Sequence, residues 1–184
     1  ERRRVTGAGD AGGISLRAAR AGAEAALALV GGATFLESYA HLLPVTDILG
    51  HVARQHAASV YERWLADPQC RCWLAEHLPG RAPVGYAVLT PPDLPLPDLA
   101  PGDLEIRRIY LLHRFQRGGL GRRLMEQVIA HGREVAARRV LLGVYSRNTA
   151  ALALYARMGF TEAGTRQFKV GGNTYHDYIL QRVP

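Results

Sequence analysis

Lysine and cysteine are both scarce in this sequence of 184 residues. Lys169 is the only lysine, so arginine supplies 22 of the 23 basic side chains. Cys70 and Cys72 are the only cysteines, which is too few for a zinc cage, and their spacing of two positions disfavours a disulfide. We therefore expect the thiols to stay reduced, as they do in the cytoplasm.

Long apolar runs are also missing. The longest, around residues 25–35, is interrupted by Gly31 and Gly32 and is shorter than the roughly 20 residues that a membrane-spanning helix needs. Residues 1–4 are charged and lead into a Gly/Ala stretch instead of an apolar signal segment. The sequence therefore predicts a soluble cytoplasmic protein with no membrane partner.

Acidic residues are outnumbered, 16 against 23 basic ones, which gives a net charge of +7. Arginine binds phosphates, contacts nucleic acids or simply hydrates a surface. A nucleic-acid binder needs a basic stripe with exposed aromatics or a helix-turn-helix, whereas these arginines are spread over several predicted elements. We expect no nucleic-acid partner, and that class stays the weaker alternative.

Hydrophobic residues make up 48% of the chain, enough for the core of one globular domain. Residues 1–13 are small, polar and glycine-rich, and are predicted to be a flexible leader. The predicted domain therefore covers residues 14–184.

The first half of this domain is predicted to contain both helices and strands. We expect a short strand over residues 14–18, and two helical pieces within residues 21–43 that break at Gly31-Gly32. One helix is predicted from Thr46-Asp47 to Ala66. A hairpin over residues 71–77 and 84–90 follows, and then a loop over residues 91–102, which holds five of the ten prolines.

The second half predicts a β-α-β unit, with strands over residues 104–112 and 140–145 and a helix over residues 119–137 between them. Such a crossover makes the two strands parallel and is right-handed. A helix over residues 148–158 is expected to end at Gly159. Strands over residues 161–170 and 173–181, joined at Gly171-Gly172, complete the prediction.

A glycine-rich turn lies between the first strand and the helix of this unit, at residues 116–123. Its glycines allow a ligand close to the backbone, and the free N–H groups of the next helical turn face that ligand. Arg122 and Arg123 oppose the helix dipole by about 0.3–1 kcal/mol each, which a bound anion would offset. The alternative is an ordinary turn with hydrated arginines. Neither a Walker loop nor the G-x-G-x-x-G dinucleotide motif is present.

The pattern Gln-x-x-Gly-x-Gly at 116–121 is preceded by the strand Glu105–Leu111 and followed by Asn148 and by Tyr155-x-x-x-Gly159-Phe160. This combination resembles the GCN5-related N-acetyltransferase (GNAT) superfamily, strongly over residues 104–160. The resemblance implies a single α/β (α+β) domain, with a mixed, mostly antiparallel sheet, a parallel β-α-β core and helices on both faces. It also implies acetyl-CoA as cosubstrate, without a metal. Thr34-Phe35 and residues 175–180 look like the polyamine-acetyltransferase branch.

The resemblance assigns residues to the cofactor. The turn would bind the pyrophosphate of acetyl-CoA through backbone amides, the strand before it would pair with the pantetheine arm, and Asn148 would contact that arm. The assigned residues are Ile109, Tyr110, Leu111, Gln116, Arg117, Gly118, Gly119, Leu120, Gly121, Arg122 and Asn148. A spacing of seven puts Asn148 and Tyr155 on one side of a helix. The alternatives are a helix N-cap for Asn148 and a core position for Tyr155.

Transfer of an acetyl group to an amine needs a base, because a lysine-like ammonium has a pKa of about 10.4. By resemblance to the histone-acetylating members, Glu105 is the candidate base; the alternative is a carboxylate paired with Arg107 or Arg108. Tyr155 is the candidate acid for the CoA thiolate. The same resemblance implies that a backbone N–H near Leu111 binds the thioester carbonyl oxygen.

One position departs from the family pattern. Other members place a base in a Leu-Glu-Val setting on the next strand, which reads Leu142-Gly143-Val144 here. This departure shifts the prediction to Glu105 or a water chain, with His113, His176 and Asp177 as weaker candidates. A non-catalytic acyl-CoA-binding module is the alternative function.

The acceptor is predicted to be a primary amine, either a small amine or polyamine or a protein amino group, that attacks directly in a ternary complex. Residues 82–106 include four acidic side chains and no basic one, so a cationic acceptor could approach there; the alternative is a hydrated proline-rich loop. Seven arginines and two glutamates lie between residues 113 and 139, around the proposed pyrophosphate turn. A homodimer is left open.

Overall fold

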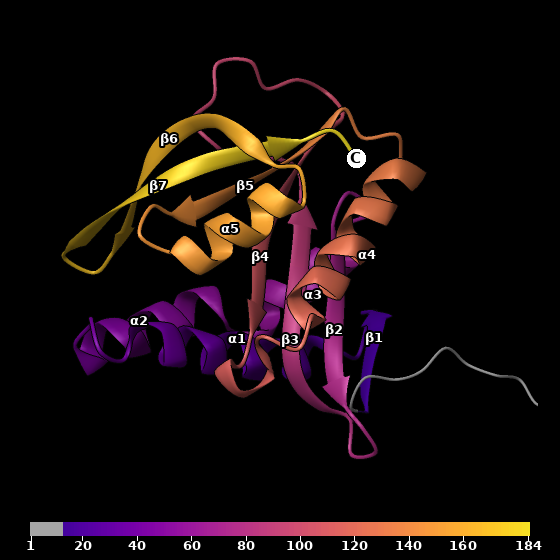
Figure 1. Cartoon of the computed structure of the whole chain (residues 1–184). Coiled ribbons are helices and arrows are strands. Elements are labelled where there is room, and N and C mark those ends of the chain that lie inside the picture. Colours follow the sequence, from indigo (N-terminus) through magenta and orange to yellow (C-terminus); the bar gives the residue numbers. More distant parts are fainter. Residues whose placement is uncertain (1–12) are drawn as a thin grey trace, which may run out of the picture.

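Seven strands form one mixed sheet in the computed structural model, which describes residues 13–184 (Figure 1). The predicted leader falls almost entirely on residues 1–12, outside the described residues. The sheet order is β1-β2-β3-β4-β5-β7-β6. The strands are β1 (Ile14–Ala18), β2 (Arg71–His77), β3 (Ala82–Thr90), β4 (Asp103–Leu111), β5 (Arg139–Tyr145), β6 (Thr161–Val170) and β7 (Asn173–Arg182). Only β4 and β5 pair in parallel, as the predicted β-α-β unit requires.

Helices cover both faces of the sheet (Figure 1). They are α1 (Glu24–Tyr39), α2 (Val45–Gln55), α3 (Ala58–Ala66), α4 (Leu120–Glu134) and α5 (Thr149–Arg157), together with a short 3-10 helix, η1 (His113–Phe115). On one face, Leu124 of α4 and Tyr155 of α5 pack with Leu142 of β5. On the other, Leu27 of α1 and Tyr61 of α3 pack with buried residues of β2 and β3. This arrangement confirms the predicted fold class.

The predicted break at Gly31-Gly32 is wrong, because α1 runs through both glycines. Gly31 is buried, and a Cβ at this position would overlap the hydroxyl of Tyr61 and Nδ1 of His56. Glycine is therefore needed for close packing between α1 and α3, and the packed helix tolerates its low intrinsic helix propensity.

The single helix predicted up to Ala66 is also wrong, because α2 ends at Gln55 and α3 begins at Ala58. His56 and Ala57 leave the helical conformation, and Ala57 is extended. The ring of His56 is only 6% exposed, with Nδ1 2.9 Å from the hydroxyl of Tyr61. The break between α2 and α3 thus places His56 in a buried position beside Tyr61, which a continuous amphipathic helix would not do.

The proline-rich loop over residues 91–102 covers one end of the sheet, where Leu94 packs on Leu141 and Ile179. The four acidic side chains of this region all have arginine partners. These pairs are Asp93 and Glu105 with Arg107, Asp98 with Arg139, and Asp103 with Arg138 and Arg139. The acidic stretch is therefore paired internally, with three arginines for four carboxylates, although Asp93 and Asp98 remain exposed.

The parallel pair β4–β5 diverges along its length. The two strands pair only where Asp103–Ile106 lies beside Arg139–Leu142. Beyond Ile106, β4 keeps β3 as its partner up to Leu111, and β5 keeps β7 up to Tyr145. Within the described residues, the β5-facing edge of residues 107–111 therefore has no strand partner, although backbone N–H and C=O groups need hydrogen bonds.

Candidate active site

The glycine turn connects this open edge to α4. Arg117 and Gly119 have left-handed backbones, with φ of 68° and 78°. Gly119 is the N-cap residue of α4 and no side chain caps the helix, so the amides of Leu120, Gly121 and Arg122 are free to bind a ligand. The first hydrogen bond of the helix runs from the Arg123 amide to the Gly119 carbonyl, at 3.0 Å. A helix start of this kind is suited to an anion such as pyrophosphate.

Gln116 ties the turn to the end of β4. Its Nε2 donates a hydrogen bond to the carbonyl of Leu111 at 3.1 Å. Ile109 and Leu111 pack toward the core of the α4 side, whereas Tyr110 faces the other side and is 42% exposed. The three residues predicted to pair with pantetheine thus lie on the open edge of β4, in line with the start of α4.

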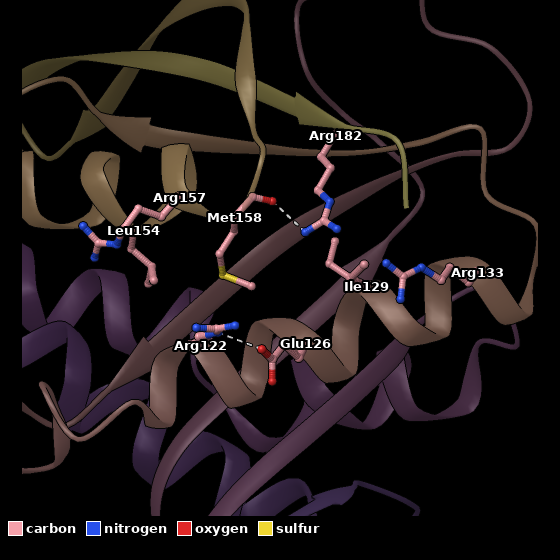
Figure 2. A pocket seen from close by; sticks show the side chains of 8 residues that line it. All are labelled: Arg122, Glu126, Ile129, Arg133, Leu154, Arg157, Met158 and Arg182. Atoms are coloured by element: carbon pink, nitrogen blue, oxygen red, sulfur yellow. Dashed lines mark hydrogen bonds and ion pairs between the residues drawn. The ribbon is translucent and has the colours of Figure 1, made fainter.

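A cavity of about 510 Å³ lies between α4 and α5 (Figure 2). Eight residues line it, of which four are arginines and one is a glutamate. They are Arg122, Glu126, Ile129, Arg133, Leu154, Arg157, Met158 and Arg182. Glu126 pairs with Arg122 at 2.8 Å, and Arg182 donates to the carbonyl of Met158 at 2.6 Å. Because Arg122 belongs to both the cavity and the first turn of α4, this positively charged cavity adjoins the glycine turn.

Asn148 and Tyr155 do not share an environment. Asn148 is exposed and caps α5, since its Oδ1 accepts a hydrogen bond from the Ala151 amide at 3.1 Å. Tyr155 is 8% exposed and packs on Phe160 with ring centroids 5.8 Å apart. Burial raises the pKa of Tyr155, and the nearby Tyr110 contributes to that rise. The capping and core roles that the sequence left open are therefore both present, and the shared side of the helix stays a prediction.

Glu105 lies at the paired end of β4 with a side chain only 2% exposed. Its Oε2 accepts a hydrogen bond from the Asp93 amide at 2.7 Å and lies 3.4 Å from the guanidinium of Arg107. The neighbouring Ile106 packs in the same cluster as Tyr155, so strand alternation places Glu105 on the opposite face of the sheet. The structure thus does not bring the predicted acid and base together on one face.

A group that sequence reasoning did not assemble lies where β4 and β5 diverge. We call Tyr39, Tyr110, Tyr145 and Tyr175 the tyrosine cluster. The ring of Tyr175 lies edge-on to those of Tyr39 and Tyr145, with centroids 6.2 Å and 5.5 Å away. Burial raises the pKa of Tyr39, and the other three tyrosines and Asp177 add to the rise. Tyr175 and Asp177 are two positions apart, a spacing that puts them on one face of a strand. Their neighbours Tyr39 and Tyr145 are distant in the sequence, so the sequence alone does not reveal the cluster.

Asp177 is the carboxylate of this group and is 6% exposed. Its Oδ2 accepts a hydrogen bond from Nε of Arg166 at 3.2 Å. Burial raises the pKa of Asp177, although the positive charge of Arg166 opposes the rise. A Cβ at Gly143 would overlap the guanidinium of Arg166. The place where related enzymes were expected to carry a carboxylate is thus filled by the arginine that holds Asp177.

His51, which is partly buried, and His56, which is buried, are neutral at pH 7. Burial and the adjacent Arg108 lower the pKa of His51 to about 4 and that of His56 to about 3. Arg108 donates to the hydroxyl of Tyr61 at 2.8 Å, and its guanidinium lies 4.8 Å from the ring centroid of Trp64. His113 and His176, the weaker sequence candidates, are exposed.

Residues 13–184 contain no group of three or more His, Cys, Asp or Glu side chains placed to hold a metal ion. In that same part of the chain, every helix is too short or too polar to cross a membrane.

Comparisons with known proteins place this arrangement in a family. A model of the Acetyltransferase (GNAT) family matches residues 36–160. An uncharacterized N-acetyltransferase of Mycobacterium tuberculosis is 34% identical over 140 residues, which cover 71% of this chain and 84% of the relative. An uncharacterized N-acetyltransferase of Lactobacillus delbrueckii subsp. lactis is 36% identical over 99 residues, or 54% of this chain and 57% of the relative.

Solved structures show the same fold. PaiA N-acetyltransferase of Thermoplasma acidophilum, in complex with coenzyme A, superposes with a TM-score of 0.70 at 14% identity, over 93% of this chain and 99% of that one. A ribosomal-protein-alanine N-acetyltransferase of Brucella melitensis gives 0.70 at 22% identity, over 92% and 99%. On the family match and the Mycobacterium relative, this chain belongs to the GNAT acetyltransferase family and is an acetyl-CoA-dependent N-acetyltransferase.

Proposed function

We propose that the protein transfers the acetyl group of acetyl-CoA to a primary amine, which attacks directly in a ternary complex. The observation that carries this proposal is the continuity of two open hydrogen-bonding features. The unpaired edge of β4 over residues 107–111 leads into the uncapped start of α4. An extended pantetheine arm ending in a pyrophosphate has the complementary groups in the same order.

The cofactor residues follow from this continuity. The amides of the turn from Arg117 to Arg122 would bind the pyrophosphate, and the backbone of Ile109–Leu111 would pair with the pantetheine arm. Asn148 would contact that arm from the start of α5. The arginine-lined cavity would take the 3′-phosphate, because Arg122 connects it to the turn and Arg157 lies on its other wall. Guanidinium groups are well suited to phosphate oxygens.

Bound acetyl-CoA supplies an acyl group that is already activated as a thioester. Tyr155 would protonate the departing thiolate, since its hydroxyl carries a proton at neutral pH. The Leu111 amide region would bind the thioester oxygen as charge develops on it. The sequence predicts Glu105 as the base that removes the ammonium proton, and the variant Glu105→Gln tests this prediction.

The acceptor is proposed to be a small amine or polyamine, or a protein amino group. Structural relatives include a ribosomal-protein-alanine N-acetyltransferase and PaiA N-acetyltransferase, whose identities to this chain are 22% and 14%. We also propose a cytoplasmic location, which the two free thiols of Cys70 and Cys72 support.

Calorimetry with two glycine variants tests cofactor binding. Gly119→Ala strains a left-handed residue of the turn, and Gly22→Ala strains one just before α1; an added Cβ meets no other atom within 4 Å at either position. Both variants should lose stability, by about 1–2 kcal/mol. Only Gly119→Ala should weaken acetyl-CoA binding, by about tenfold. Equal affinities in the two variants would contradict the proposed turn.

A further inference from the structure

Asp177 on β7 neighbours the end of β5, the strand that diverges from β4. Asp177 lies directly opposite Tyr145 in the antiparallel β5–β7 pair. Leu142 and Val144 pack with α4 and α5, so the alternation of β5 turns Gly143 and Tyr145 to the other face. Asp177 therefore lies on β7 beside the last residue of β5, one strand away from the opening between β4 and β5, with its side chain on the face away from the proposed nucleotide cavity.

The surroundings of Asp177 leave it available for proton transfer. Its ion pair with Arg166 uses Oδ2 and a single arginine nitrogen. The titratable and charged groups around it come from every neighbouring element: Arg166 on β6, Tyr145 on β5, Tyr110 on β4, Tyr39 on α1, and Tyr175 and His176 on β7. Asp177 is the only carboxylate in this set. Burial makes it more basic than an ordinary aspartate, which a general base requires.

The tyrosine cluster gives this carboxylate a suitable setting for a cation. Tyr175 contacts Tyr39 and Tyr145 edge-on, and Tyr110 is exposed at the open edge of β4. Aromatic ring faces attract ammonium groups, and the tyrosine hydroxyls accept hydrogen bonds from N–H donors. A primary ammonium group has the charge, size and donors to bind here.

We infer that the tyrosine cluster binds the ammonium group of the acceptor and that Asp177 is its general base. This inference rests on the proposed N-acetyltransferase function. The carboxylate of Asp177 takes one proton from the ammonium, and the resulting amine forms a C–N bond to the thioester carbonyl carbon. The C–S bond breaks, and Tyr155 protonates the thiolate to give free CoA. The amide nitrogen loses its second proton to solvent, Tyr155 regains a proton from solvent, and Asp177 returns its own to solvent.

Glu105 is less well placed to act as this base. Its buried carboxylate is held by both the Asp93 amide and Arg107, under the proline-rich loop. It also lies where β4 and β5 still pair, before the strands open. An acceptor at the tyrosine cluster would lie beside Asp177 and not at that closed end.

The test compares the pH–rate profiles of five proteins, namely the wild type and the variants Asp177→Asn, Arg166→Gln, Glu76→Gln and Glu105→Gln, with an amine that the wild type acetylates. In the wild type, kcat/KM should fall on the acidic side as Asp177 is protonated. Asp177→Asn should lower kcat/KM at pH 7 by about a hundredfold and remove this limb, so that the rate follows deprotonation of the free amine. Arg166→Gln should keep activity and shift the limb to higher pH, because the lost cation had lowered the Asp177 pKa. Glu76→Gln, which breaks a buried carboxylate–arginine pair with Arg17 on the far strands, should leave the profile unchanged.

Acetyl-CoA affinity separates this inference from the proposed function. A wild type that neither binds acetyl-CoA nor releases CoA would contradict the proposed function. A working wild type whose acidic limb survives in Asp177→Asn, or vanishes only in Glu105→Gln, would overturn Asp177 as base. Identical behaviour of Asp177→Asn and Arg166→Gln would also overturn it, since a purely structural ion pair loses the same contact from either side. We expect Asp177→Asn to retain acetyl-CoA affinity within about twofold, which excludes misfolding as the cause.

Discussion

The side-chain amide of Gln116 donates a hydrogen bond to the carbonyl of Leu111 at 3.1 Å, across the short helix η1. This bond joins the end of β4 to the start of the glycine turn. It fixes the distance between the edge that we assign to pantetheine and the amides that we assign to pyrophosphate. This hydrogen bond takes no part in the acetyl-transfer step, so its loss should affect cofactor binding.

Gln116→Ala should therefore raise the KM for acetyl-CoA by about three- to tenfold and leave kcat nearly unchanged, because one neutral hydrogen bond contributes about 0.5–1.5 kcal/mol. Steady-state kinetics with varied acetyl-CoA measures this. Gln127→Ala, an exposed glutamine on α4, is the control. A fall in kcat alone would show that Gln116 does not act through the turn.

Tyr155→Phe should lower kcat by about ten- to a hundredfold between pH 7 and 9, because the thiolate then leaves without a proton donor. Acetyl-CoA affinity should stay unchanged. Tyr178→Phe removes a hydroxyl from another tyrosine packed against the same core cluster and should leave kcat intact. If turnover of Tyr155→Phe is unchanged over this pH range, Tyr155 is not the acid.

Arg157→Gln should weaken acetyl-CoA binding by about five- to tenfold, because a phosphate in the arginine-lined cavity would lose a charged hydrogen-bond donor. The same variant should bind 3′-dephospho-acetyl-CoA as well as the wild type does. Arg63→Gln, an exposed arginine of α3, controls for net charge. Equal losses for both ligands would place the 3′-phosphate elsewhere.

The two glycines of α1 should respond differently to alanine. Gly31→Ala should cost about 1–3 kcal/mol, because its Cβ would overlap Tyr61 and His56. Gly32→Ala meets only Val52, at 3.4 Å, and should be neutral or stabilising by up to about 1 kcal/mol. Urea denaturation measures both. Equal changes in the free energy of unfolding would contradict the packing explanation for Gly31.

Asp103 should make stability depend on acid pH. Burial opposes its ionisation, but hydrogen bonds from Arg139, the Ala100 amide and Arg138 outweigh burial and lower its pKa. Its contribution is therefore present above the unfolded pKa of about 3.9 and lost as pH falls through the folded value. Asp103→Asn should cost about 3 kcal/mol at pH 7 and much less near pH 2. Equal losses at both pH values would show that the ion pairs contribute nothing.

The strands and the glycine turn were predictable from sequence because their signals are local. Apolar runs, turn residues and the β-α-β order identify β4, α4 and β5 without knowledge of distant contacts. The continuity of the helix at residue 31 and the helix break at residue 56 were not predicted correctly, because both depend on tertiary packing. Gly31 and His56 take their conformations from packing against Tyr61, which local propensity does not contain.

The candidate site divides in the same way. The turn from Gln116 to Arg122 is one continuous segment, so its motif was visible. The tyrosine cluster draws residues from α1, β4, β5 and β7, and only the β5–β7 register brings Tyr145 opposite Asp177. The arginine excess also needed the structure, since part of it lines the cavity while Arg107, Arg138 and Arg139 neutralise the proline-rich loop.

Release of free CoA from acetyl-CoA, measured with a panel of amines, tests whether the protein transfers the acetyl group to a primary amine. The panel should contain a simple primary amine, a polyamine and a peptide with a free amino terminus, each compared with its N-acetylated form. CoA release should depend on at least one free primary amine, with one acetylated product formed per CoA. Binding of acetyl-CoA without amine-dependent release for any member of the panel would contradict acetyl transfer to an amine and would favour a non-catalytic acyl-CoA-binding module.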